Sequence, residues 1–442
     1  MVEICTVGGY NAVGKNCTAI KVGDEAFMLD LGIHLENYIK FTQDEELVDV
    51  NPKELMQAGA VPDIEAIYDW KPYMKMVLPT HAHLDHVGAI PYLINSLKAP
   101  VMCTPFTSEV IKNMFTDDKL KMNSKLRQIS SNSSFQITPN VKAEFIHVTH
   151  STPQTAMIAL HTREGIILYA NDFKFDLFPT LGKKPNFKRI EELKNENVLA
   201  LICDSTYAPD ARKMPSESVA KQMLKEVMLG TDSKNKHVVA TTFSSHIARL
   251  NSIVEYGQKM GRKIVFMGRS LAKYVNAAEA AGIANLSGRV EMVKYAGQIE
   301  RKLKKIAKER GKYLMVVTGH QGEPKSTLGK IVNGDIKFNF MPDDHVIFSC
   351  KTIPTPTNIE NRKQLELGLQ KQHVRMFKDV HTSGHAARED LRELVNMVKP
   401  KHIIPAHGDY TMLSSMADLA EEMGYERGNN VHIMRDSQRI RL

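Results

Sequence analysis

Residues 81–86 read HAHLDH and follow directly on the apolar run KMVLPT at 75–80. The run predicts a buried strand, so the motif lies where that strand ends and the chain turns. Four side chains able to bind a metal stand within these six residues, three imidazoles and one carboxylate, with no thiolate. Such a set is typical of a catalytic zinc site that keeps a position for water. The alternative is a polar turn whose histidines merely cap a helix.

Three further ligand-type residues stand where predicted strands end. His150 follows AEFIHVT, Asp172 follows GIILYAN, and His407 follows HIIPA. Because strand ends can share one edge of a sheet, we expect these side chains to converge with the motif on two neighbouring metal sites. One site would use His81, His83 and His150, the other Asp85, His86 and His407, and Asp172 would bridge them. Asp30, after the run AFML, is a candidate for holding a ligand imidazole by a hydrogen bond.

The pattern of the chain changes near residue 216. Before it, short β-rich runs such as CTAIKVG and GIILYANDF alternate with polar turns, which predicts a sheet-rich sandwich flanked by helices. After it, helical and strand patterns alternate, which predicts a parallel sheet covered by helices. The Pro-rich stretch TIPTPTNIENRK marks an exit from this block. We therefore expect a first domain formed by residues 1–203 and 361–442, with residues 204–360 inserted as an α/β domain.

Composition narrows the class of protein. The chain has 442 residues, of which 43% are hydrophobic, enough for more than one buried core. No run of about 18 apolar residues is present, so no membrane span is expected. The N-terminus lacks the pattern of a secretion signal, and the five cysteines never form a CxxC pair. Reduced core thiols and a cytoplasmic location are therefore expected.

The positive charge is concentrated in one block. Residues 204–360 hold 25 basic and 15 acidic residues, a net of +10, whereas the rest of the chain holds 33 and 35, a net of −2. Such a surface attracts polyanions, so nucleic acid is the leading class of partner. Part of the excess is the run RKLKKIAKERGK at 301–312, which is equally well interpreted as a solvated helix face.

Several quoted motifs resemble one known fold family. FMLDLG, HAHLDH, VTHSTP, NDFKFD and PAHGDY resemble the five successive motifs of the metallo-β-lactamase fold, and the central block resembles its β-CASP insert, with CDSTYA, VTGHQGEP and HTSGHA as motifs. The phrases TTFSSHIARL, FMGRS, TGHQGEP and HTSGHA are most similar to the RNase J family. The resemblance implies an α/β fold, a metallo-β-lactamase αββα sandwich with an inserted β-CASP α/β domain. The short stretch after His407 resembles the compact archaeal type, and it puts in doubt dimerisation through an extra C-terminal domain.

The resemblance also implies a function. The implied function is that of a zinc-dependent 5′–3′ exoribonuclease in RNA decay and maturation. Such an enzyme prefers 5′-monophosphate RNA, and the resemblance leaves an additional endonuclease activity open. Two zinc ions per subunit are implied, and the ligand set leaves manganese open. The resemblance implies catalytic roles for Asp85, Asp204 and His385. His385 would act as the general acid or stabilise the phosphate. Contacts to single-stranded RNA are implied for Ser245, Arg269, Glu323, Ser383, His385 and Ala386.

Two other functions are alternatives to this one. An endoribonuclease similar to polyadenylation factors, cleaving at RNA 3′ ends, would share the fold and the metals. A metal-free RNA-binding scaffold would have lost ligands, whereas all seven are present here. The sequence leaves open a homodimer, a place in an RNA-decay assembly, and the preference for RNA over DNA.

Overall fold

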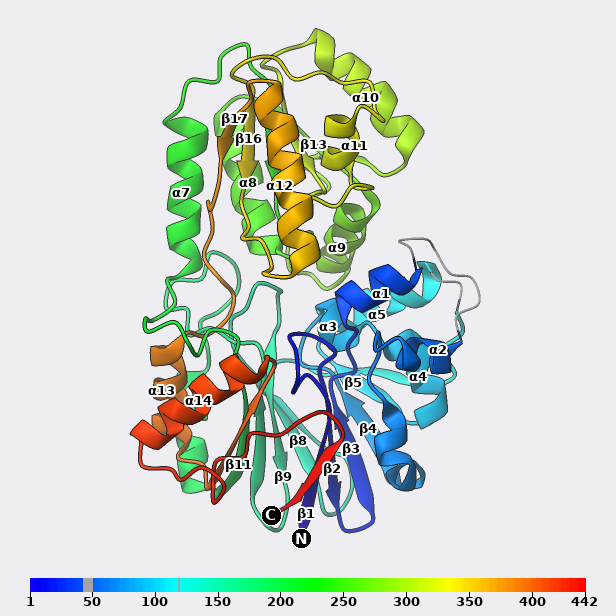
Figure 1. Cartoon of the computed structure of the whole chain (residues 1–442), viewed down its shortest axis with the longest axis vertical. Coiled ribbons are helices and arrows are strands. Elements are labelled where there is room, and N and C mark those ends of the chain that lie inside the picture. Colours follow the sequence, from blue (N-terminus) through cyan, green and yellow to red (C-terminus); the bar gives the residue numbers. More distant parts are fainter. Residues whose placement is uncertain (43–50, 118–119) are drawn as a thin grey trace. The chain divides into compact units, whose positions relative to one another are not determined.

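The computed structural model describes residues 1–42, 51–117 and 120–442, and these divide into two compact units. The core unit comprises Met1–Leu177, Lys183–Met214 and Gly384–Leu442. The insert unit comprises Phe178–Gly182 and Pro215–Ser383, which are mostly green to orange in Figure 1.

The first sheet of the core unit has seven strands in the order β19-β1-β2-β3-β4-β5-β6. Its early strands form antiparallel hairpins, and β3 to β6 run parallel to one another. The bounds are β1 Val2–Gly8, β2 Cys17–Val22, β3 Glu25–Leu29, β4 Met74–Leu78, β5 Val101–Cys103, β6 Leu126–Gln128 and β19 Gln438–Arg441.

The second sheet of the core unit has six strands in the order β18-β11-β10-β9-β8-β7. Its bounds are β7 Ser133–Gln136, β8 Lys142–His147, β9 Ala156–His161, β10 Ile166–Ala170, β11 Val198–Asp204 and β18 His402–Ala406. Strand β11 precedes the insert unit and β18 follows it, yet the two pair in parallel with Asp204 opposite Ala406. The segment between them is therefore inserted between neighbouring strands of one sheet.

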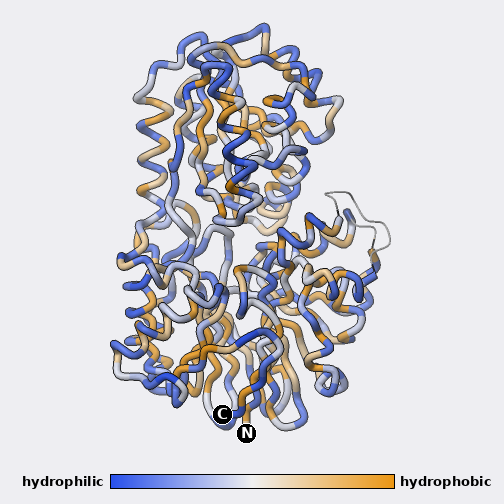
Figure 2. The backbone as a smooth tube through the Cα atoms, in the orientation of Figure 1, coloured by the Kyte–Doolittle hydropathy of each residue, from blue (hydrophilic) through white to orange (hydrophobic). Residues whose placement is uncertain are grey.

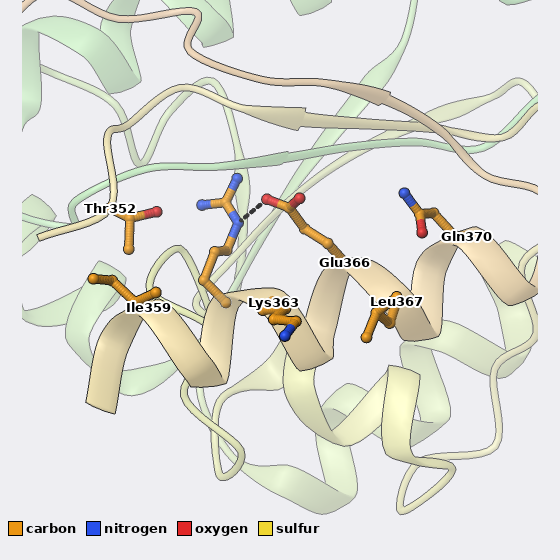
Figure 3. A pocket seen from close by; sticks show the side chains of 7 residues that line it. Thr352, Ile359, Lys363, Glu366, Leu367 and Gln370 are labelled. Carbon is orange, nitrogen blue, oxygen red and sulfur yellow. Dashed lines mark hydrogen bonds and ion pairs between the residues drawn. The ribbon is translucent and has the colours of Figure 1, made fainter. Parts of the chain in front are cut away.

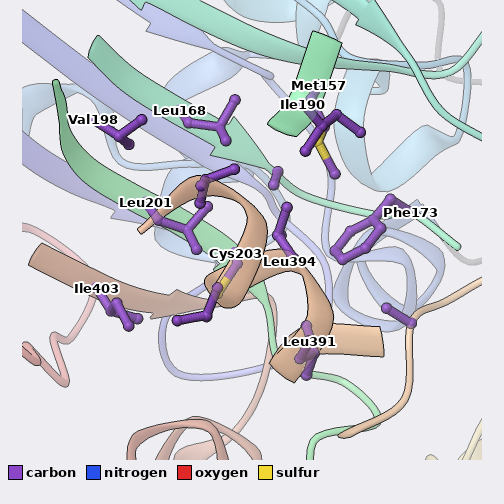
Figure 4. Packing of buried hydrophobic residues seen from close by; sticks show 14 of the residues in the cluster. Met157, Leu168, Phe173, Ile190, Val198, Leu201, Cys203, Leu391, Leu394 and Ile403 are labelled. Atoms are coloured by element: carbon purple, nitrogen blue, oxygen red, sulfur yellow. The ribbon is translucent and has the colours of Figure 1, made fainter. Parts of the chain in front are cut away.

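Hydrophobic side chains of the two sheets form a shared core. Phe27 and Leu29 of the first sheet cluster with Phe145, Ile158 and Ile202 of the second, and all are fully buried. Figure 2 shows these strands as largely hydrophobic segments. A second cluster lies between the second sheet and its helices, where Leu391 and Leu394 of one helix meet Leu201 and Ile403 (Figure 4). Burial of this kind contributes about 25 cal/mol per Å² of apolar surface.

The core unit carries its helices around these sheets. Their bounds are α1 Leu35–Thr42, α2 Pro52–Gln57, η1 Ile64–Tyr73, α3 Leu84–Val87, α4 Ile90–Leu97, α5 Pro105–Asp117, α6 Phe187–Glu192, η2 Leu193–Asn195, α13 Arg388–Val398 and α14 Tyr410–Glu422. Across the described ranges of both units, none of the helices combines the length and the apolar character needed to span a bilayer. All five cysteines are buried and free, as predicted.

The insert unit is built on one six-stranded parallel sheet in the order β14-β13-β15-β12-β16-β17. The strands are β12 Val238–Thr241, β13 Lys263–Met267, β14 Glu291–Val293, β15 Tyr313–Val317, β16 His345–Phe348 and β17 Arg375–Phe377. The helices are α7 Glu217–Leu229, α8 Ile247–Lys259, α9 Arg269–Ala280, α10 Ala296–Lys308, α11 Thr327–Asn333 and α12 Pro356–Lys371. Because all strands are parallel, the loops after them gather at one edge of the sheet.

The predicted α/β class, a sandwich with an inserted parallel-sheet unit, is confirmed. The Pro-rich stretch is different from its prediction: it does not leave the insert but begins α12, with Pro356 in the first turn and Thr355 as N-cap. Proline suits that position because its fixed φ is helical and its missing N–H is not needed there. The compact units divide at 214/215 and 383/384 rather than at the predicted 203/204 and 360/361, and those domain boundaries stay a prediction.

Candidate metal centre

The seven predicted ligands lie together in the core unit. His81 and His83 follow β4, while Asp85 and His86 belong to the short helix α3. The other three stand in the loops that follow strands of the second sheet: His150 after β8, Asp172 after β10, and His407 directly after β18. They form two groups, each with ligand atoms within 4.8 Å of one another: His81, His83, His150 and Asp172, and Asp85, His86, Asp172 and His407.

Imidazole nitrogens converge in the first group. Nε2 of His81 lies 3.0 Å from Nδ1 of His83, which in turn lies 3.1 Å from Nε2 of His150. Oδ2 of Asp172 lies 3.5 Å from the His81 nitrogen and 3.4 Å from the His150 nitrogen.

In the His81 and His150 rings, the Nδ1 atom makes a hydrogen bond that points away from the first ligand group. These bonds determine that Nε2 faces the group. Nδ1 of His150 donates to the Gly384 carbonyl at 2.7 Å, because a carbonyl can only accept. Thr80 donates its hydroxyl hydrogen to Asp30 at 3.0 Å, so its oxygen accepts from Nδ1 of His81 at 3.0 Å. Both Nε2 atoms therefore present lone pairs to the same point, an arrangement that suits a cation.

The second group is more acidic. Nε2 of His86 lies 3.3 Å from Asp172 and 3.5 Å from Asp85, and Nε2 of His407 lies 3.4 Å from Oδ1 of Asp172. That Oδ1 atom is buried and has no hydrogen-bond partner, which is costly for a carboxylate in a protein interior. The Oδ2 atom of Asp172 thus lies near histidines of both groups, while Oδ1 has no donor, and a carboxylate with these contacts fits a bridging ligand of two cations.

Asp30 contacts a histidine of the candidate ligand set, and its role in supporting the ligands stays a prediction. Its carboxylate accepts from the Thr80 amide at 2.7 Å and from Nδ1 of His86 at 2.7 Å. Asp30, Asp172 and His407 all have positive φ angles, of 59°, 46° and 58°. Non-glycine residues are strained in that region by about 1–3 kcal/mol each, a cost that is characteristic of functional sites.

The candidate ligand histidines differ in the direction in which their surroundings shift the pKa. Burial holds the pKa of His81 and His150 well below the usual range and lowers that of His83 to about 4, so these rings are neutral at pH 7. Burial also acts on His86, but Asp172 and Asp30 outweigh it and hold its pKa well above the usual range. The neutral form is the one that binds metals through nitrogen.

His385 and Asp204 lie beside the ligands. Nδ1 of His385 donates to Oδ2 of Asp204 at 2.7 Å, and its Nε2 lies 3.8 Å from Asp172. Burial lowers the pKa of His385, but Asp204 and Asp172 more than offset this and raise it to about 10. A protonated imidazole held by a carboxylate can donate a proton or stabilise a phosphate.

Sequence reasoning missed three residues that support the centre. Thr80 and Gly384 hold His81 and His150 as described above, and buried Asn16 donates to the Asp85 carbonyl at 3.1 Å and accepts from Asn171 at 3.1 Å. A Cβ atom at Gly384 would come within 2.8 Å of the Ser151 amide nitrogen and 2.9 Å of the His150 ring. The glycine in HTSGHA was a signal of close backbone approach, whereas Thr80 and Asn16 gave none.

The predicted RNA contacts divide between the units. Ser245, Arg269 and Glu323 follow β12, β13 and β15 at one edge of the parallel sheet of the insert unit, which also contains Ser383. His385 and Ala386 belong to the core unit. These contacts stay a prediction.

A separate cleft of about 330 Å³ runs along α12 in the insert unit. Figure 3 shows Ile359, Lys363 and Leu367 on the helix beside it. Arg362 also lines the cleft and pairs with Glu366 at 2.8 Å. None of the residues lining it belongs to the candidate ligand set.

Three family matches cover most of the chain. Residues 235–364 match the ribonuclease J β-CASP domain, 371–434 match a Zn-dependent metallo-hydrolase RNA specificity domain, and 56–225 match the beta-lactamase superfamily domain. Ribonuclease J of Methanocaldococcus jannaschii is 37% identical over 99% of this chain and 98% of its own length. Ribonuclease J of Pyrococcus abyssi is 38% identical over 100% and 97%.

The chain belongs to the ribonuclease J family. It is thus a ribonuclease of the RNase J type, a metal-dependent hydrolase that acts on RNA. Ribonuclease J 1 of Streptococcus pyogenes is 30% identical, and the match covers 74% of that longer protein. A crystal structure of a protein of unknown function from Enterococcus faecalis V583 shares the fold, with a TM-score of 0.65 over 99% of both chains at 16% identity.

Proposed function

We propose that this ribonuclease J family member degrades single-stranded RNA from the 5′ end, prefers a 5′-monophosphate, and uses two zinc ions. The observation that carries the proposal is the pair of ligand groups sharing Asp172, whose buried Oδ1 has no donor. Zinc suits a set of imidazoles and carboxylates without thiolates, and manganese is the other metal that such a set accepts.

The seven ligands would hold the metals, His81, His83 and His150 on one side and Asp85, His86 and His407 on the other, with Asp172 between them. When bound, two such ions supply a Lewis acid and generate a nucleophile from water at neutral pH. Thr80, Asp30 and the Gly384 carbonyl orient the ligand rings before any metal arrives.

His385 would act on the scissile phosphate. Because its Nδ1 hydrogen is donated to Asp204, its second nitrogen is the one available to the reacting group. With its pKa raised to about 10, that nitrogen carries a proton at neutral pH and can give it to the leaving 3′-oxygen. Asp204 positions the ring and keeps it charged.

The direction of decay rests on the predicted contacts of Ser245, Arg269, Glu323, Ser383, His385 and Ala386. Serine hydroxyls and backbone amides are groups that bind a terminal phosphate. These contacts would make a 5′-monophosphate end the preferred start.

The test combines metal analysis with a time course on uniformly labelled RNA. Mononucleotide release from the first time point, faster for 5′-monophosphate than for 5′-triphosphate or 5′-hydroxyl RNA, is the expected result. Internal fragments alone would favour the endoribonuclease that cleaves 3′ ends, and equal rates on all three ends would remove the proposed pocket. Protein isolated with metal other than zinc, and active with it, would correct the metal assignment.

A further inference from the structure

Helix α10 carries an unusual concentration of positive charge. Residues 294–312, which include it, hold eight basic and two acidic residues, a net charge of +6 out of +8 for the whole chain. Arg301, Lys304, Lys305 and Lys308 are all exposed, and we call these four residues the α10 stripe. Spacings of three, four and seven place them on one side of the helix.

The opposite side of α10 fixes the stripe in place. Ile299, Leu303 and Ile306 are buried in the hydrophobic core of the insert unit, where they cluster with Val265 and Tyr313. The helix therefore cannot rotate to hide its charges, and Figure 1 shows α10 on the outside of its unit. The stripe is a rigidly presented surface.

The stripe is not neutralised by the protein itself. Within the described residues, none of its four side chains takes part in an ion pair, a side-chain hydrogen bond or a ring contact. Lys302, on the flank of the same helix, is different: its Nζ atom pairs with Glu291 and lies 4.7 Å from the centre of the Tyr313 ring.

Some surface cations of the insert unit are paired with carboxylates. Lys221 of α7 and Lys259 of α8 both contact Glu255, at 2.7 Å each. Like charges three or four positions apart on one helix face repel one another, so the four unpaired charges of the stripe destabilise one another. A polyanion bound to the stripe would remove that repulsion.

The position of α10 beside the parallel sheet places its first turn at the same sheet edge as the candidate RNA loops. The helix begins directly after the edge strand β14, at the same edge of the parallel sheet as the loops that hold Ser245, Arg269 and Glu323. It then runs back toward the start of β15. At its first end stands Tyr295, 62% exposed, and an exposed aromatic ring is a surface on which a base can stack.

We propose that the α10 stripe binds phosphates of single-stranded RNA outside the catalytic centre, with Tyr295 stacking on a base. The inference rests on the proposed function for its choice of RNA, since the charges alone would suit any polyanion. The stripe adds affinity for long substrates and takes no part in cleavage. A short RNA that ends before it reaches the stripe gains nothing from it.

The test uses the full chain with Arg301→Gln, Lys305→Gln and Lys308→Gln combined. The matched control replaces three exposed lysines of the same unit that lie on other elements, Lys225, Lys234 and Lys371, also by glutamine. Both variants lose three positive charges, so any effect of net charge is shared. A third variant, Lys304→Arg, Lys305→Arg and Lys308→Arg, keeps the charge.

Binding is measured by fluorescence anisotropy with metal removed by chelation, so that cleavage does not intervene. For RNA of about 30 nucleotides, loss of three single-strand phosphate contacts should weaken binding by about tenfold and lower the salt slope by about 2. The control and the arginine variant should bind as the wild type does. For RNA of about 5 nucleotides, all four proteins should bind alike, because one such oligomer fills only a single small site.

Equal losses in the stripe variant and the control would overturn the proposal and leave α10 as a solvated helix face. Unchanged affinity in the stripe variant would do the same, and capture of an acidic protein by the wild type alone would then point to a protein partner. These results are independent of the proposed function. If the wild type failed to cleave 5′-monophosphate RNA but the stripe variant still lost long-RNA binding, the proposed exonuclease would fail and the stripe would stand.

Discussion

Two clusters of buried charge, one in each unit, show opposite designs. In the insert unit, the fully buried Arg249 guanidinium contacts both oxygens of Glu217 at 2.6 and 2.8 Å, and it donates to the Ser349 and Val380 carbonyls. In the core unit, the Asp172 carboxylate stands among five imidazoles with one oxygen lacking any donor. A satisfied network stabilises a fold, whereas converging acceptors without donors prepare a site for a cation.

The largest effect is expected from His81→Ala, which removes a ligand and should lower RNA cleavage at least about 10³-fold, since generation of the nucleophile is lost. Metal content measured by mass spectrometry should fall with it. RNA affinity should be retained, because most cationic surface lies in the insert unit. His402→Ala, outside the site, is the control. Full turnover by His81→Ala would mean that the converging imidazoles are not the metal centre.

The Arg249→Met variant tests the other cluster. It leaves the Glu217 carboxylate buried without its main partner, and we expect a loss of about 3–5 kcal/mol in the free energy of unfolding. Denaturant unfolding gives that quantity, and metal content should stay at the wild-type level. Adding Glu217→Gln should restore part of the loss. If the single variant were as stable as the wild type, the contrast between the clusters would disappear.

Gly384→Ala tests whether the backbone orients a ligand. The new methyl group would press on the His150 ring and the Ser151 amide, so we expect metal affinity to fall about 10- to 100-fold, as for loss of other groups that orient ligands. Competition with a fluorescent chelator measures it. Gly297→Ala in α10, where no atom lies within 4 Å of the added carbon, is the control and should be silent. An equal metal affinity in both variants would contradict the role of the Gly384 carbonyl.

The smallest effect is expected at a third, partly exposed cluster of charge, formed by Glu144, Arg189 and His161. Glu144 accepts from Arg189 at 2.7 Å and from His161 at 2.8 Å; although burial acts the other way, these partners lower its pKa to about 2. The folded pKa is depressed, so the stabilisation is complete above about pH 4.5 and is lost as the pH falls toward about 2. Glu144→Gln should cost about 1–2 kcal/mol at pH 7.

Thermal unfolding of both proteins across this pH range is the measurement. The gap between them should narrow as the pH falls below about 4.5, where the unfolded carboxylate takes up its proton, and should close toward about pH 2, where the folded carboxylate does so too. A gap that persisted at pH 2 would assign the loss to packing rather than to charge.

The sequence was most informative where chemistry is concentrated. Ligand-type residues at strand ends predicted both groups of the centre, and alternating patterns predicted the parallel sheet of the insert. The support of the ligands was harder to predict, because the Gly384 carbonyl and His150 are separated by 234 residues and no local pattern links them. The start of α12 was not predicted either: the Pro-rich stretch was expected to leave the insert, whereas its second proline stands in the first turn of this helix.

The β-bridge between Tyr207 and Ala387 has a consequence for synthesis on the ribosome. The chain leaves the second sheet and re-enters it at one point, and the strand that completes this sheet, β18, is made after the whole insert. A nascent chain that has emerged only as far as β11 lacks His407, so it cannot assemble the second ligand group. A site that needs His407 can therefore form only after translation has passed residue 407.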